Sequence, residues 1–158
     1  MKLPARVRYA VRAMVELAAR SGQGPVPVKV LAEAQGLSPK YVKQLMSRLH
    51  RENLVTGRRG NTGGYLLARD AEKITALDIH RAMGEGLSLA PCVGGVACRL
   101  RPICSAGRLW TELSATLAKQ MGSVTIGQLA ARGSALASKS SPSGKPGSRA
   151  KARREETR

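Results

Sequence analysis

The sequence contains no phenylalanine, one tryptophan and three tyrosines among 158 residues. This scarcity excludes a core built on aromatic clusters, because too few large rings are present to fill one. Hydrophobic residues still make up 42% of the chain, which is enough for an interior of Leu, Val, Ile, Ala and Met side chains. At this length, one folded domain with some additional segment is the expected organisation.

Acidic residues are also scarce, since 10 Asp and Glu stand against 27 Lys and Arg and leave a formal net charge of +17. Such an imbalance predicts a polyanionic partner, with nucleic acid favoured over an acidic membrane surface. A purely solubilising role for the charge is the alternative. We favour nucleic acid because the cations gather on one predicted helix face, as described below.

Long apolar runs are absent as well. No stretch of 18 apolar residues occurs, so we predict no membrane-spanning helix and no membrane partner. Charges interrupt the N-terminal stretch MKLPARVRYAVRAMVELAAR, which therefore lacks the apolar centre of a secretory signal. We expect a cytoplasmic protein, and in a reducing compartment the three cysteines favour metal or redox chemistry over structural disulfides.

We predict three regions, residues 1–72, 73–132 and 133–158, and a break in composition marks the start of the last. The last is rich in Ser, Gly, Pro, Lys and Arg with almost no apolar content, which predicts a disordered basic tail. It carries seven cations and two carboxylates, so it accounts for +5 of the charge and residues 1–132 for +12. The part predicted to fold is therefore basic in its own right.

Helical periodicity dominates residues 1–132. We predict helices over residues 4–20, 28–35, 39–52, from 75 onward, 105–121 and 125–131. Ser38 and Pro39 are typical of a helix start, and the runs LVTGRR and GYLLAR around Gly60–Gly63 predict a β-hairpin. This order predicts a mainly α fold with a small β-hairpin wing: a winged helix-turn-helix domain, followed by a region with a long dimerisation helix.

The helix over residues 39–52 has two chemically opposite faces. Its apolar face spans roughly 100° of the helical wheel and consists of Val42, Leu45, Met46 and Leu49. The opposite face carries no carboxylate and consists of Lys40, Lys43, Gln44, Ser47 and Arg51, flanked by Tyr41 and Arg48. Lys and Arg can bond guanine and Gln can bond adenine, whereas an ordinary solvated face would mix both charge signs. Ser38 and the hairpin residues Arg58 and Arg59 complete the predicted DNA-binding set, because arginine suits the minor groove.

Three stretches together carry a family resemblance: MKLPARVRYAVRAMVELA, RRGNTGGYLLARD and a Cys-x5-Cys-x5-Cys pattern about 20 residues later. Over residues 1–131 the chain resembles the IscR-type (Rrf-type) iron–sulfur winged-helix transcription regulators of bacteria. The resemblance implies a homodimer that binds a palindromic operator in double-stranded DNA, mostly as a repressor. No enzyme or small-molecule substrate is expected, since no nucleophile–base pair or phosphate-binding loop can be placed.

Cys92, Cys98 and Cys104 can be read in four ways: packing, a disulfide, a zinc site or an iron–sulfur cluster. Gly94, Gly95 and Pro102 indicate a loop rather than a buried element, and neither gap between cysteines has the short spacing usual for zinc. Spacing alone leaves the choice open. The resemblance implies an iron–sulfur cluster on three thiolates, with [4Fe–4S] slightly favoured over [2Fe–2S]. A cluster-free regulator that uses thiol oxidation is the alternative.

The expected fourth cluster ligand is missing. Some relatives place a His three residues after the third cysteine, where this chain has Gly107, and others use an acidic residue near the partner chain's N-terminus, where this chain is rich in Arg. The remaining candidates are His80, Asp78, Glu85 and Glu112, or a ligand from solution; His80 is expected on the surface of its helix. An incompletely protein-ligated cluster would respond to oxygen, nitric oxide or iron.

Overall fold

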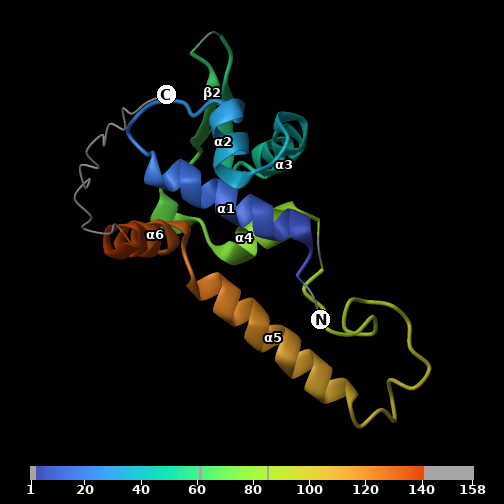
Figure 1. The fold of residues 1–158 in the computed structure, drawn as a ribbon. Coiled ribbons are helices and arrows are strands. Elements are labelled where there is room, and N and C mark those ends of the chain that lie inside the picture. Colours follow the sequence, from blue (N-terminus) through green and yellow to red (C-terminus); the bar gives the residue numbers. More distant parts are fainter. Residues whose placement is uncertain (1–2, 61, 85, 141–158) are drawn as a thin grey trace, which may run out of the picture.

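The computed structural model describes residues 3–60, 62–84 and 86–140. Helices α1 (Ala5–Ala19), α2 (Val28–Gln35) and α3 (Pro39–Arg51) come first, followed by the antiparallel hairpin of β1 (Val55–Arg58) and β2 (Gly64–Leu67). A short 3-10 turn η1 (Ala71–Lys73) leads to α4 (Ala76–Ala82), α5 (Gly107–Ser123) and α6 (Ile126–Ser140). The predicted mainly α fold with a two-stranded wing is confirmed (Figure 1). Among the described residues, no helix has the length and apolar character needed to cross a membrane.

The core is built from aliphatic side chains and methionine, as the missing aromatics require. The predicted inner face of α3 is fully enclosed, with Val42, Met46 and Leu49 at 0% exposure. It packs with Met14 of α1 and Leu31 of α2 into one continuous cluster. Burying each of these larger side chains contributes about 1.5–3 kcal/mol. The helix that presents polar residues outward is thereby fixed to the body of the domain.

Local signals explain where α3 and the wing begin. The Ser38 hydroxyl accepts a hydrogen bond from the Tyr41 amide at 3.3 Å, and Pro39 occupies the first helical position, as predicted. The strands pair from Val55 opposite Leu67 to Arg58 opposite Gly64. A Cβ on Gly64 would lie 2.3 Å from the Val26 carbonyl oxygen, so only glycine lets the segment before α2 pair with the wing.

A capping box is present at the start of α4. The Thr75 hydroxyl accepts from the Asp78 amide at 3.1 Å, and the Asp78 carboxylate accepts from the Thr75 amide at 2.9 Å. The Asp78 carboxylate is thus occupied in capping the start of α4. Thr75 also pairs with Thr125 across an isolated bridge, which brings the start of α6 back to α4.

Helix α5 projects from the domain, and the loop of residues 86–106 runs from beside the domain out to the far end of α5 (Figure 1). Among its residues only Ser114 is buried. The helix begins at Gly107 rather than at the predicted Ser105, and Ala106 before it provides no side-chain cap. We call the loop and α5 together the arm (residues 86–123).

Helix α6 differs from the prediction. It was expected to end at residue 131, with a disordered tail from 133, but it continues to Ser140. Residues 133–140, GSALASKS, contain no proline and include the helix formers Ala, Leu and Lys, so a single Gly133 does not end the helix. Helix α6 packs on α1, and its Ile126 is completely buried. The rest of the predicted tail, residues 141–158, lies outside the described residues.

Candidate DNA interface and cysteine site

The exposed face of α3 and the wing border a common cleft of about 690 Å³. Lys43 and Ser47 line it from α3, and Arg58 and Arg59 line it from the hairpin. None of the residues that line the cleft is acidic. The structure thus brings together four of the predicted DNA-binding residues that are up to 16 positions apart in the sequence.

The neighbouring turns of α3 present a second shallow hollow, which is lined by Gln44, Ser47, Arg48 and Arg51. Lys40 is exposed at the start of the same helix and lines neither hollow. The outward face of α3 is therefore cationic along its length. Its cations point to the side where the wing also projects.

Three predicted DNA-binding residues also make contacts within the protein. Ser38 caps α3, as described above, and the half-buried Tyr41 packs edge-on against Tyr9 of α1, with ring centroids 6.2 Å apart. Arg48 is half-buried, and its Nη1 donates to the Met83 carbonyl oxygen at 3.1 Å, just after α4 ends. Arg48 thus links α3 to the segment that leads into the cysteine loop.

His50 is a site residue that the sequence reasoning did not include. It lines the cleft beside Lys43 and Ser47, and its Nδ1 lies 2.9 Å from the Val55 carbonyl oxygen at the start of β1. This hydrogen bond fixes the wing relative to α3. The available signal was its spacing, because positions 43, 47 and 50 fall on one face of a helix.

All three cysteines line one pocket of about 510 Å³ at the free end of the arm. Cys92 is half-buried, Cys98 and Cys104 are exposed, and all three are free thiols. Short-range hydrogen bonds shape the loop, such as the Gly107 amide to the Cys104 carbonyl oxygen at 3.2 Å. The buried Ser114 hydroxyl accepts from the Leu89 amide at 3.0 Å and ties the loop's first part to α5.

The residues around this pocket fit an iron–sulfur cluster in the chemistry of their donors. Three thiols share the pocket with the cationic side chains of Arg101 and Arg108, and thiolates are the usual ligands of such clusters. A Cβ at Gly107 would lie 3.9 Å from the Cys104 Sγ, so the glycine leaves open space beside that sulfur. Within the described residues, no three His, Cys, Asp or Glu side chains are close enough to hold a metal ion. The loop would therefore close to draw the thiols together.

The candidates for the fourth cluster ligand lie in different surroundings. His80 is 2% exposed rather than at the helix surface as predicted, because Leu3, Pro4 and α5 cover that face of α4. It lines a different pocket, beside Leu117 and Met121. Asp78 serves the capping box, and Glu85 lies outside the described residues. Glu112 alone of the described candidates lines the cysteine pocket.

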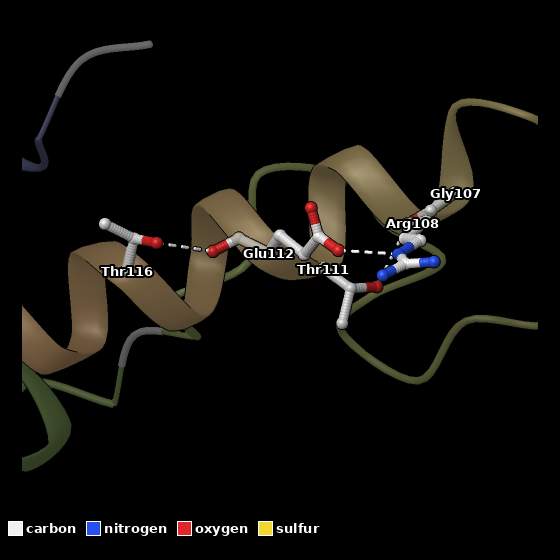
Figure 2. Close-up of polar contacts among 5 residues, drawn as sticks. All are labelled: Gly107, Arg108, Thr111, Glu112 and Thr116. Carbon is white, nitrogen blue, oxygen red and sulfur yellow. Dashed lines mark hydrogen bonds and ion pairs between the residues drawn. The ribbon is translucent and has the colours of Figure 1, made fainter.

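Glu112 is held by a neighbour on its own helix. Figure 2 shows its carboxylate reaching back to Arg108, with Nε of Arg108 2.7 Å from Oε1 of Glu112. The Thr111 and Thr116 hydroxyls donate to the carbonyl oxygens of Gly107 and Glu112, at 3.0 and 2.8 Å. These threonines are bound to the backbone, so Arg108 is the partner of the Glu112 side chain among the residues drawn.

The other side of the arm is apolar and exposed. Leu109, Trp110 and Leu113 are 49, 37 and 42% exposed, and Val96, Leu100 and Ile103 of the loop are more so. Such a concentration of exposed apolar side chains is unusual for a surface that remains in water.

Comparisons with known proteins agree on one family. Residues 3–132 match the Rrf2 family model, which is described as an iron-dependent transcriptional regulator. The HTH-type transcriptional regulator IscR of Xenorhabdus nematophila is 39% identical over 129 residues, covering 82% of this chain and 79% of the relative. Among solved structures, T. potens IscR superposes with a TM-score of 0.70 at 31% identity, covering 84% of this chain and 88% of that one.

A second solved structure is CymR, the global cysteine regulator of B. subtilis. It superposes with a TM-score of 0.71 at 30% identity and covers 84% of this chain and 98% of that one. These relatives confirm the predicted resemblance and the winged-helix fold, and they are regulators rather than enzymes. With a family match over nearly the whole described chain, the protein belongs to the Rrf2 family as an IscR-like transcriptional regulator.

Proposed function

We propose that this regulator binds a palindromic operator in double-stranded DNA, mostly as a repressor, and that an iron–sulfur cluster on Cys92, Cys98 and Cys104 switches its affinity. The supporting observation for DNA binding is the cleft shared by Lys43 and Ser47 of α3 with Arg58 and Arg59 of the wing. Cations on a helix and a wing can follow the phosphates of two adjacent grooves, while Gln44 and Lys43 face base edges.

A homodimer is part of the proposal. The apolar side chains of α5 are exposed in the single chain, and a second copy of α5 would cover Leu109, Trp110 and Leu113. A twofold dimer carries two α3 helices and matches two half-sites related by the same symmetry. The protein is proposed to act in the cytoplasm.

The switch would act through the arm. When bound, the cluster supplies a redox-sensitive and reversible cross-link between the three thiolates, with [4Fe–4S] slightly favoured over [2Fe–2S]. Ordering the loop of residues 86–106 would change how α5 sits on α4, and the Arg48–Met83 hydrogen bond joins the end of α4 to α3. A 100-fold change in operator affinity requires about 2.7 kcal/mol of coupling, an ordinary size for allostery.

The decisive experiment combines metal analysis with unbiased operator selection. Protein purified without oxygen is assayed for iron and acid-labile sulfide, and its absorption spectrum is recorded. Loaded and cluster-free forms then select binders from a random duplex library at low salt. We expect iron and sulfide in comparable amounts and a palindrome enriched by one form only. A colourless protein without iron or sulfide would refute the cluster, and no enriched sequence in either form would refute operator binding.

A second candidate function is a cluster-free regulator that senses oxidants by its thiols. The observation that favours it is the exposure of Cys98 and Cys104 as free thiols. Under this alternative, protein with no iron would change its operator affinity after peroxide treatment, and a Cys98→Ser variant would not respond.

A further inference from the structure

We infer that Glu112 is the fourth protein ligand of the cluster and that Arg108 holds its carboxylate until the cluster is loaded. This inference rests on the proposed function, since it names a residue toward the same cluster. It starts from position: Glu112 lines the pocket that contains all three cysteines, and it is the only carboxylate among the described residues that do so.

Gly107 and Glu112 line the same pocket, five residues apart on α5. Gly107 opens α5 next to Cys104, and Glu112 follows after about one and a half helical turns. The pocket wall includes Gly107, Arg108, Thr111 and Glu112, so one face of the first turns of α5 borders the thiols. The long Glu side chain lies on this wall, whereas glycine at 107 supplies no donor atom.

The current partner of Glu112 is one that iron can replace. Arg108 and Glu112 form an i,i+4 pair whose side chains are 89 and 60% exposed. Exposed pairs of this kind stabilise a helix only slightly, because water competes for both groups. Carboxylate oxygen is an accepted iron ligand, although it is harder than thiolate and exchanges more readily. A carboxylate at the fourth position therefore suits a cluster that is meant to be lost or modified in response to a signal.

Charge also favours this exchange. Three thiolates and a carboxylate bring four negative charges to one pocket, and Arg101 and Arg108 line the same pocket. Arg101, the other cation of the pocket, would offset part of that charge once the Glu112 carboxylate is released from Arg108. No electron would be transferred: the Arg108–Glu112 ion pair would break, and the carboxylate would take the place of a solvent ligand on iron, which would leave as water.

The other described acids and histidines are less suitable. The Asp78 carboxylate accepts from the Thr75 amide and hydroxyl at 2.9 and 2.8 Å, so ligation would break the capping box. His80 lies in a separate pocket among apolar side chains. His50 is on α3 and is bonded to the wing.

The test measures how fast the reconstituted full-length protein loses its cluster to an iron chelator without oxygen, followed by visible absorbance. We expect Glu112→Gln to lose the cluster at least about tenfold faster than the wild type, because even the loss of an outer-shell partner weakens metal affinity by about 10–100-fold. Glu33→Gln is the matched control, because Glu33 forms an exposed i,i+4 pair with Lys29 on α2, far from the cysteines in sequence. It should lose the cluster at the wild-type rate.

Two further variants separate ligation from a mere helix contact. Arg108→Gln breaks the same ion pair but frees Glu112, so it should slow cluster loss, whereas a structural role predicts faster loss in both variants. Glu112→Cys should retain the cluster at least as well as the wild type. Its ⁵⁷Fe Mössbauer spectrum should lose the distinct iron site that an oxygen ligand creates.

The outcomes are distinguishable. A wild-type protein that takes up no iron and sulfide overturns the proposed cluster and this inference together. A wild type that holds a cluster, with Glu112→Gln losing it at the wild-type rate, overturns the role of Glu112 alone. Equal acceleration by Glu112→Gln and Arg108→Gln also overturns it.

Discussion

The winged domain and the arm of this protein are built in opposite ways. In the winged domain, α1, α2 and α3 enclose a continuous core whose central side chains are completely buried. In the arm, α5 buries only Ser114 and exposes leucines and a tryptophan. The first region is packed within one chain, with Ile79 of α4 and Ile126 of α6 completing its core. The second lacks covering partners in a single chain, which is the property expected of a region that responds to a second subunit and a ligand.

The largest expected effect comes from emptying the core of the winged domain. Leu49→Ala should lower the free energy of unfolding by about 2–5 kcal/mol, because Leu49 is 0% exposed and its removal leaves a cavity. Leu100→Ala in the arm, where the side chain is 62% exposed, should change it by less than about 0.5 kcal/mol. Urea unfolding followed by circular dichroism measures both. Similar losses for the two variants would mean that the arm has a core of its own.

A smaller effect is expected from placing a charge on the apolar face of α5. Leu113→Asp should weaken self-association by about 30-fold or more, equivalent to a hot-spot loss of about 2 kcal/mol. Leu136→Asp on α6 is the matched control, since that leucine is 68% exposed and lies outside the arm. Sedimentation equilibrium over a range of concentrations gives both constants. A dimer that tolerates Leu113→Asp but not Leu136→Asp would move the interface from α5 to α6.

Next in size are two arginines on α3 that the sequence alone does not distinguish. Arg51 is exposed, and Arg51→Ala should reduce the slope of log affinity against log salt for operator binding by about 1. Arg48→Ala should leave that slope unchanged, because its guanidinium is bonded to the Met83 carbonyl oxygen. It should instead reduce the difference in operator affinity between the loaded and cluster-free protein. Fluorescence anisotropy at several salt concentrations measures both, and an equal slope change would identify Arg48 as a phosphate contact.

These arginines show which features local sequence can predict. The cap at Ser38, the capping box at Thr75 and the apolar face of α3 follow from short-range spacing, and all are present. The partner of Arg48 lies 35 residues away, and the burial of His80 depends on α5 lying over α4. Such long-range packing leaves no periodic signal. The pocket that the cysteines share with Glu112 could be predicted only in part. The helix register places Glu112 near the start of α5, but the fold of the loop decides where the cysteines lie.

The smallest expected effects come from changing the residues that precede α3 and α5. Ser38→Ala should destabilise the protein by about 1 kcal/mol, because it removes the hydroxyl that accepts from the Tyr41 amide. Adding a hydroxyl before α5 should stabilise the protein little. Ala106 has helical backbone angles of φ −82° and ψ −13°, whereas Ser38 has the extended angles of a capping residue, φ −70° and ψ 143°. A serine at position 106 would not place its oxygen over the first free amides of α5. We therefore expect Ala106→Ser to change thermal stability by less than about 0.5 kcal/mol. A gain as large as the loss in Ser38→Ala would show that the start of α5 readily adopts the capped geometry, and that the arm orders itself without a ligand.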